Sequence, residues 1–180
     1  MNIALFTDTY LPDINGVATS TSILKNELVK HGHQVLVVTT VLPHDSLYTD
    51  EDQYILRLPG LDLKKLYGYR ASNIYSIKGM REVRDFNPDI IHIQTEFGVG
   101  IFGKIAGEIL DIPVCYTYHT MWADYSHYIA PGNIKAVDQV AKKIIEKISK
   151  IYGETCSELI VPSQKTADAL REYGILNSIN

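Results

Sequence analysis

The amino-acid sequence predicts an α/β domain built on a doubly wound, mostly parallel sheet. Short apolar runs alternate with helix-length amphipathic segments from one end of the chain to the other. The connections between strands are long enough for helical crossovers, which parallel strands require. The apolar runs also lack the polar alternation of a half-exposed strand, as expected for strands covered on both faces. In such a sheet, ligands bind at the carboxyl ends of the strands.

The elements of the first half follow from apolar runs and from residues that end helices. Residues 2–7 and 34–40 form buried strands, and the helix between them covers about 17–31. Gly32 ends that helix because it adopts a left-handed conformation at low cost. Residues 54–58 form a third strand. A polar, basic and aromatic segment, 59–72, precedes a helix at about 73–86, which Pro88 interrupts.

The second half continues the same alternation. Strands are expected at 89–94, 113–118 and 158–162, and helices at about 98–110, 134–152 and 164–173. Ser163 caps the last helix and Gly174 ends it. The helix at 134–152 carries an apolar stripe that favours core packing over membrane insertion: Val137, Val140, Ala141, Ile144, Ile148 and Ile151.

Composition excludes several classes of protein. Of the 180 residues, 46% are apolar and 21% charged, which is typical of a soluble globular protein, and no apolar run approaches the roughly 18 residues of a membrane span. The N-terminus lacks the pattern of a secretory signal, so we expect a cytoplasmic location.

Cys115 and Cys156 are far apart in sequence and are expected to be reduced thiols. A net charge of −4 argues against nucleic acid as a partner.

The charge is unevenly distributed. Six basic residues and one acidic residue lie between Lys64 and Arg84. Within this stretch lysine, arginine and tyrosine interleave, a mixture suited to an anionic membrane surface. The predicted membrane-contact residues are Lys64, Lys65, Tyr67, Tyr69 and Arg70. A solvated loop whose tyrosines pack on the domain is the alternative interpretation.

The loop after the first strand is the position where nucleotide-binding sheets hold phosphate. The dinucleotide fingerprint GxGxxG is absent, which disfavours a nicotinamide oxidoreductase. Asn15, Gly16 and Val17 nevertheless open a helix whose amide groups and dipole could hold a donor diphosphate. An ordinary turn between strand and helix explains the same residues, and the residue chemistry alone favours it.

Three segments, in this order, resemble the family-4 retaining glycosyltransferases of GT-B architecture: LFTDTYLPDINGVATS, YTYHTMWADYSHY and LIVPSQKTADALREYG. The bacterial group that glucosylates diacylglycerol is the most similar. The resemblance implies a Rossmann-like N-terminal, acceptor-side domain covering 1–180. The donor-binding domain, with its pair of glutamates, would lie outside this chain, and the chain alone would be inactive.

The resemblance also implies site residues. His119 is identified as the family histidine that contacts the donor sugar near the reaction centre, and it is the catalytic candidate. Candidate acceptor-binding residues lie on loops at the carboxyl edge: Asp8, Tyr10, Gln94, Glu96, Thr120, Trp122 and Tyr125. For Glu96 and Asp8 a structural role as a helix cap is an open alternative, and for Glu96 we favour it.

The implied reaction transfers a hexose, expected to be glucose from UDP-glucose, to a lipid hydroxyl such as that of diacylglycerol, with retained configuration. No cofactor or metal is expected. The enzyme would associate peripherally with the inner face of the cell membrane. Two alternatives stay open: the same family with a sugar or another small-molecule acceptor, and a non-catalytic module that binds lipid or a partner protein.

Two apparent metal motifs are interpreted as structural. Asp50-Glu51-Asp52 matches the DxD pattern of another glycosyltransferase fold, but it lies in a polar loop and is expected to be a solvated turn. In His31-Gly32-His33 the glycine ends a helix, and no third ligand is evident.

Overall fold

The computed structural model divides the chain into two compact units, Met1–Cys115 and Tyr116–Asn180. We describe each unit by itself. The residues it describes are 1–42, 46–50, 52–62, 70–119, 135–175 and 179, and within the helices and strands the side chains of 61, 62, 70, 71, 135–142, 144 and 145 are outside this description.

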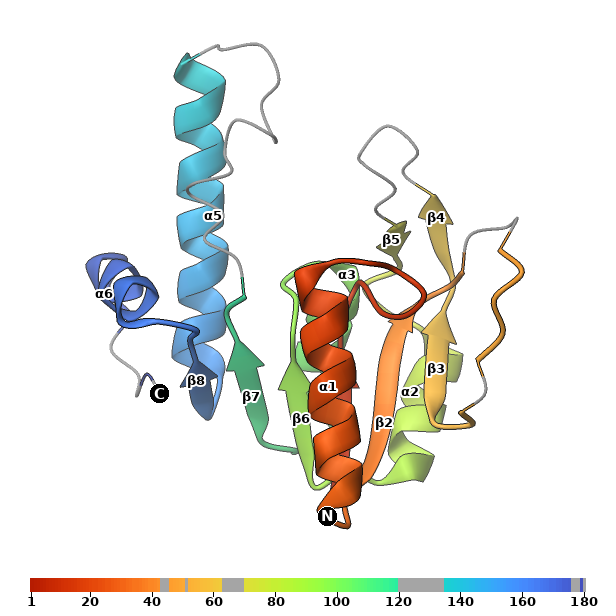
Figure 1. Ribbon diagram of the computed structural model, residues 1–180. Helices are drawn as coiled ribbons and strands as arrows, with labels where there is room; N and C mark the ends of the chain where they lie inside the picture. The colour runs from red at the N-terminus through yellow and green to blue at the C-terminus, as the bar shows by residue number, and fades with distance from the viewer. Residues whose placement is uncertain (43–45, 51, 63–69, 120–134, 176–178, 180) are drawn as a thin grey trace. The chain divides into compact units, whose positions relative to one another are not determined.

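The first unit is built on parallel strands (Figure 1). The element β1 (Asn2–Phe6) pairs with β2 (Gln34–Thr40) on one side and with β6 (Ile90–Ile93) on the other, and β2 pairs with β3 (Ile55–Leu58). The complete strand order is β3-β2-β1-β6-β7-β8, in which β7 (Val114–Thr117) crosses the unit boundary. The parallel α/β sheet predicted from the sequence is confirmed.

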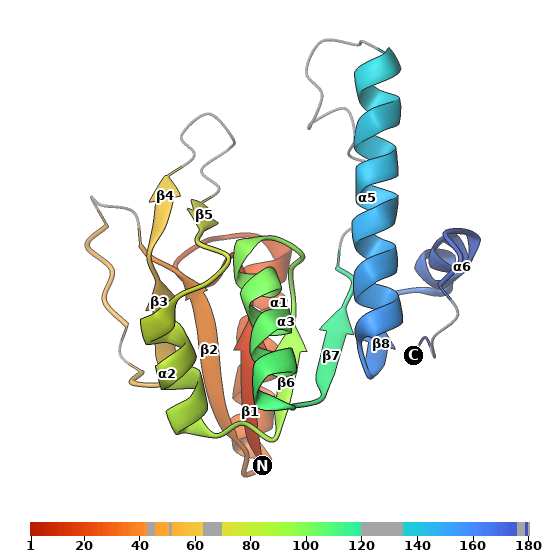
Figure 2. The same cartoon turned by 180° about the vertical axis from the view of Figure 1, so that it is seen from behind.

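Helices cover both faces of this part of the sheet. Figure 1 shows α1 (Gly16–Lys30) in front of the strands, and Figure 2 shows α2 (Ile77–Phe86) and α3 (Gly98–Leu110) on the opposite face. One part of the core consists of Ile3, Leu5, Tyr10, Val35 and Val37, with Leu24 and Leu28 of α1 packed against it. The expected helix at 98–110 and strand at 34–40 have the predicted bounds.

The segment 59–72 differs from the sequence prediction. It contains a short antiparallel pair, β4 (Gly60–Asp62) and β5 (Arg70–Ser72), where no strand was expected. The following helix begins at residue 77 instead of 73. Ser76 explains the later start, because its hydroxyl accepts the Gly79 amide at 3.0 Å and so caps the helix.

The second unit contains α5 (Lys135–Thr155), β8 (Glu158–Ile160) and α6 (Gln164–Glu172). The ring of Tyr116 packs against Tyr118 and Tyr152, with centroids 6.1 and 5.0 Å apart. Near the end of α5 the predicted stripe is partly wrong: Ile151 is 43% exposed, whereas Ser149, Tyr152 and Cys156 are buried. As predicted, Ser163 caps α6, and Gly174 follows it with a φ of 79°.

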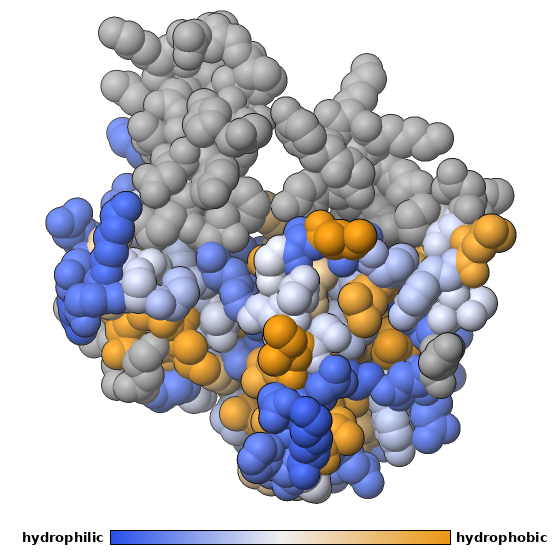
Figure 3. Space-filling view, viewed as in Figure 1, coloured by the Kyte–Doolittle hydropathy of each residue, from blue (hydrophilic) through white to orange (hydrophobic). Residues whose placement is uncertain are grey.

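Several apolar side chains of the first unit are exposed. Ile14, in the loop after β1, and Leu47, after β2, are both 99% exposed. Ile23 and Val29 of α1 are exposed as well, and Figure 3 shows hydrophobic patches on the face that carries this helix. Among the described residues, no helix is long and apolar enough to cross a bilayer.

Candidate functional site

The N-terminus of α1 is open at Gly16. The Asn15 side chain accepts the Ala18 amide at 2.9 Å and donates to the Thr9 hydroxyl at 2.7 Å, so it caps the helix. A Cβ on Gly16 would meet no atom within 4 Å, and its φ is not left-handed. The backbone amides of Gly16 and Val17 lie in the first turn of the helix, where N–H groups have no intrahelical carbonyl to donate to. The cap explains Asn15, whereas no contact among the described residues requires glycine at position 16.

Asp8 connects the carboxyl ends of β1, β2 and β6 through hydrogen bonds. Its carboxylate accepts the Val99 amide at 2.9 Å and the Thr95 hydroxyl at 2.6 Å, and its own amide donates to Thr95 Oγ1 at 2.8 Å. The Thr40 hydroxyl donates to the carbonyl of Asp8 at 3.2 Å. Asp8 is 6% exposed. The carboxylate therefore caps α3, the role expected for Glu96.

Burial is the larger influence on the charge state of Asp8. It raises the pKa of this carboxyl above its ordinary value, because an ionised group is poorly solvated in the interior. The hydrogen bonds from Thr95 and from the backbone amides of Val99, Gly100 and Phe97 act in the opposite direction. Asp8 thus serves as a structural acceptor, and a role in acceptor binding stays a prediction.

The strand β6 leads into the second group of predicted acceptor residues. Gln94 is 2% exposed, and its backbone amide donates to the Phe6 carbonyl at 2.8 Å. Glu96 is 7% exposed. The next helix approaches closely: a Cβ on Gly100 would lie 1.8 Å from the carbonyl oxygen of Thr95. Glycine at this position lets the first turn of α3 pack directly against the end of β6.

Arg57 joins the loop after β1 to the segment after β2, a role that the sequence analysis missed. Its guanidinium forms a bidentate ion pair with Asp50, at 2.6 and 2.8 Å. It also donates to the carbonyls of Thr40, at 3.0 Å, and of Leu11, at 2.6 Å. An arginine in an otherwise apolar strand was the available signal, since a buried charge requires partners.

The two aspartates of the Asp50-Glu51-Asp52 motif form ion pairs, so the prediction of a solvated turn is wrong for them; Glu51 lies outside the described residues. Asp50 pairs with Arg57, and Asp52 forms an ion pair with Lys25 of α1, whose side chain is 8% exposed. Each aspartate is thus neutralised by a cation of this chain. Across the described ranges, no group of three histidine, cysteine or acidic side chains could hold a metal ion.

In the second unit, His119 follows β7 and is half-buried. Burial lowers the pKa of its imidazole below the ordinary value of 6.5, which favours the neutral form near pH 7. Two hydrogen bonds hold the preceding residue, Tyr118. Its backbone amide donates to the Ile160 carbonyl at 2.9 Å, and the Ser149 hydroxyl donates to the Tyr118 hydroxyl at 3.3 Å. A neutral imidazole can both donate and accept a hydrogen bond.

The remaining predicted residues are distributed as follows. Tyr10 is 2% exposed and hydrogen-bonds through its phenol with Ser22 of α1. The candidates Thr120, Trp122, Tyr125, Lys64, Lys65, Tyr67 and Tyr69 lie outside the described residues, as does the side chain of Arg70.

The sequence pattern of the family described as Glycosyltransferase Family 4 matches residues 14–178. The chain belongs to this family. It is therefore a family-4 glycosyltransferase sequence, as its three motifs predicted, and the match includes the N-terminus of α1 and His119.

Two curated relatives show which family-4 proteins this chain resembles. It is 36% identical over 97% of its length to an alpha-monoglucosyldiacylglycerol synthase from Streptococcus pneumoniae, of which it covers 38%. It is 35% identical over 94% of its length to a protein of the same name from Acholeplasma laidlawii, of which it covers 42%. The chain thus spans about two-fifths of the length of these relatives.

A solved structure agrees with the fold. Sucrose-phosphate synthase from Thermosynechococcus elongatus superposes with a TM-score of 0.64 over 99% of this chain and 47% of that protein, at 16% identity. At this identity the likeness shows the fold alone. It agrees with the Rossmann-like half of a GT-B architecture.

Proposed function

We propose that this chain is the acceptor-side part of an enzyme that transfers a hexose from a nucleotide sugar to the hydroxyl of diacylglycerol, with retention of configuration. The observation that carries the proposal is the 36% identity, over 97% of the chain, to a protein named alpha-monoglucosyldiacylglycerol synthase. The proposed donor is UDP-glucose. The second wall of the donor cleft comes from a domain outside these residues, so residues 1–180 alone do not turn over substrate.

The open N-terminus of α1 supports a role in donor binding. Amides at the start of a helix, together with the helix dipole, stabilise an anion such as a departing diphosphate. Within the part of the chain that the structure describes, no neighbouring atom requires glycine at position 16, which is consistent with close approach of a ligand to its backbone. The proposed donor contacts are Asn15, Gly16 and Val17.

His119 is the proposed catalytic residue. In its neutral form it donates a hydrogen bond to the donor sugar at the reacting centre. Attack on the same face as the departing phosphate, assisted by that phosphate, preserves the configuration without a covalent intermediate. The proposed acceptor contacts are Asp8, Tyr10, Gln94, Glu96, Thr120, Trp122 and Tyr125. Asp8 also has a structural role, because it caps α3, and Tyr10 has one as part of the core.

Exposed apolar and basic side chains support peripheral binding to an anionic membrane. The proposed contacts are Lys64, Lys65, Tyr67, Tyr69 and Arg70. Later in the sequence, Ile74 and Ile77 are 55% and 74% exposed. Lys78 and Arg81 of α2 are exposed next to them. Aliphatic groups flanked by cations bind a bilayer surface through both apolar burial and charge.

The proposed reaction is tested with the full-length protein, vesicles containing diacylglycerol, and UDP-glucose. We expect a glucosylated lipid, and we expect His119→Ala to lower turnover by orders of magnitude while the protein remains folded. Near-normal turnover of His119→Ala would remove the catalytic role assigned to this residue.

Membrane binding is tested separately, by co-sedimentation with anionic liposomes at low and high salt. Charge reversal at Lys64, Lys65 and Arg70 is expected to abolish a salt-dependent interaction. An enzyme that glucosylates a soluble acceptor and ignores liposomes would favour the sugar or small-molecule acceptor instead.

A further inference from the structure

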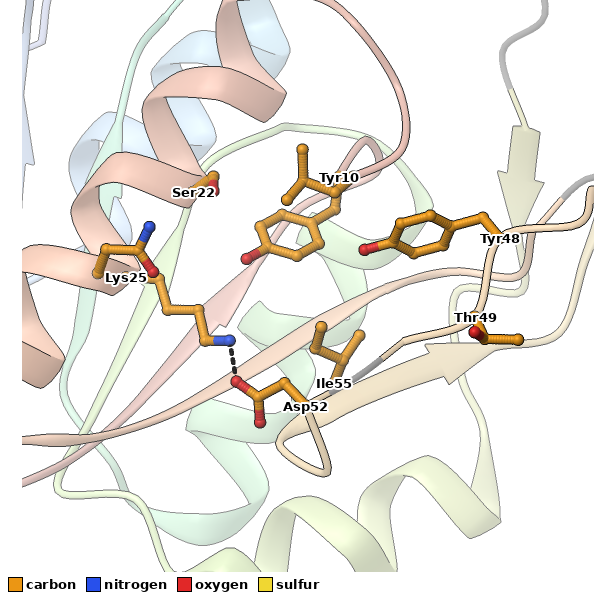
Figure 4. Close-up of a pocket in the computed structure, with 9 residues that line it drawn as sticks. Tyr10, Ser22, Lys25, Tyr48, Thr49, Asp52 and Ile55 are labelled. Atoms are coloured by element: carbon orange, nitrogen blue, oxygen red, sulfur yellow. Dashed lines mark hydrogen bonds and ion pairs between the residues drawn. The ribbon is translucent and has the colours of Figure 1, made fainter.

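A small cavity lies in the first unit, between α1 and the segment that leads into β3 (Figure 4). Its volume is about 350 Å³ and it opens to solvent. It is lined by Tyr10, Leu11, Ser22, Lys25, Asn26, Tyr48, Thr49, Asp52 and Ile55. Of these residues only Tyr10 belongs to the predicted acceptor set, so the cavity is a feature that the proposed transferase site does not explain.

Two ion pairs fix the outer wall of this cavity. Residues 46–50 and 52 of the wall belong to no helix or strand. Asp50 is nevertheless held by the bidentate contact with Arg57, and Asp52 by Lys25. Both pairs are largely shielded, with side-chain exposures between 8% and 38%. The wall is therefore anchored at two points, and the cavity is formed before a ligand arrives.

The lining combines aromatic surface with hydrogen-bonding groups of both kinds. Tyr10 and Tyr48 both line the cavity, and in the view of Figure 4 their rings lie above the Lys25–Asp52 pair. Ser22, Asn26 and Thr49 add two hydroxyls and an amide. The Ser22 hydroxyl already bonds the Tyr10 phenol, but a purely apolar ligand would displace water from the Asn26 amide and the Thr49 hydroxyl, at a cost in free energy. An anion gains little, because the ammonium group of Lys25 already has a carboxylate partner.

We infer that this cavity binds a monosaccharide or a cyclic polyol of similar size. Such a ligand presents C–H groups to tyrosine rings and hydroxyls to amide, hydroxyl and carboxylate groups. The volume is at the small end of the range for ligand pockets, which suits one sugar ring. This binding does not depend on the proposed transferase activity.

The test is a titration of the 180-residue chain, labelled with ¹⁵N, with D-glucose, D-mannose, D-galactose and myo-inositol. We expect saturable shifts of the Asn26 and Tyr48 amides with at least one of these ligands, in the millimolar range typical of a small contact area. Inorganic phosphate is the anionic comparison and should leave these amides unshifted. An absence of saturable shifts with all four ligands, or shifts with phosphate alone, would overturn the inference.

Variants locate the binding. Asn26→Ala lies on an exposed helix position that tolerates alanine, and it should weaken binding by about three- to tenfold through a lost hydrogen bond. Tyr48→Leu should weaken it by about two- to tenfold through lost aromatic contact. Tyr54→Leu is the matched control, since Tyr54 is exposed in the same segment but does not line the cavity. Equal losses in Tyr48→Leu and Tyr54→Leu, with unchanged binding in Asn26→Ala, would place the ligand elsewhere.

Discussion

Replacing Asp8 with alanine removes the acceptor that holds the start of α3. The Val99 amide and the Thr95 hydroxyl both lose their partner in a region that water does not reach. A hydrogen bond to a charged group contributes about 1.5–3 kcal/mol and a helix cap about 0.5–2 kcal/mol. Since the two contributions share one carboxylate, we expect a loss of about 2–4 kcal/mol in the free energy of unfolding.

Thermal and urea unfolding, followed by circular dichroism, measure this loss. For a chain of this size, the expected fall in Tm is about 4–16 °C. Asp89→Ala is the matched control, because Asp89 is an exposed aspartate that also accepts one backbone amide, that of Asn2 at 2.7 Å. Its loss should stay below about 1 kcal/mol. If Asp8→Ala were no more destabilising than Asp89→Ala, the cap assigned to Asp8 would be refuted.

Asp8→Asn separates the hydrogen bonds from the charge. The amide oxygen can still accept the Val99 amide, so we expect less than half the loss of the alanine variant. Burial raises the pKa of Asp8 in the folded state, so ionisation is easier in the unfolded chain. The stability of the wild type relative to Asp8→Asn should therefore be greatest below about pH 4 and fall as pH rises through the folded-state pKa. A relative stability that instead increases with pH would mean that the hydrogen bonds outweigh burial.

Three further predictions concern the other residues of the site. Gly16→Ala should leave Tm unchanged or raise it slightly, because a Cβ at this position meets no atom. In the full-length protein the same change should raise the KM for the nucleotide sugar. A marked fall in Tm would show a structural need for glycine. Arg57→Ala should lower the free energy of unfolding by about 3–5 kcal/mol, because it leaves Asp50 unpaired. Arg57→Lys should recover less than half of this loss, and full recovery by lysine would contradict the bidentate role. His119 should titrate below its ordinary pKa of 6.5 in NMR spectra, and its contribution to stability should be lost as pH falls from about 6.5 through the folded-state pKa; a midpoint above 6.5 would contradict the burial described here.

The sheet could be predicted because each buried strand is a local apolar run. The runs at 2–7, 34–40 and 89–94 gave strands close to the bounds in the structure, and residues with special backbone roles such as Gly32 and Gly174 marked the helix ends. The pair β4–β5 was missed because three-residue strands carry little periodicity. Their existence depends on pairing with each other instead of on a local pattern.

The location proposed for the site follows from the predicted sheet, because ligands bind at the carboxyl ends of parallel strands. Asp8, Gly16 and His119 were selected on that ground, and their roles in binding and catalysis stay predictions. The partners of Asp8 are 87 and 91 residues away in sequence, so no local pattern could show that it caps α3. Asp50 differs in this respect, because its partner Arg57 is only seven residues away, and an arginine in an otherwise apolar strand was a local signal for the ion pair.

Transfer of glucose to diacylglycerol is the reaction that most directly tests the proposed function. The decisive measurement incubates the full-length protein with UDP-glucose and diacylglycerol in anionic vesicles and determines the anomeric configuration of the product by NMR. We expect an α-linked monoglucosyl lipid, which retains the configuration of the donor, and its loss in His119→Ala. A β-linked product, or transfer to soluble acceptors alone, would contradict the proposed function.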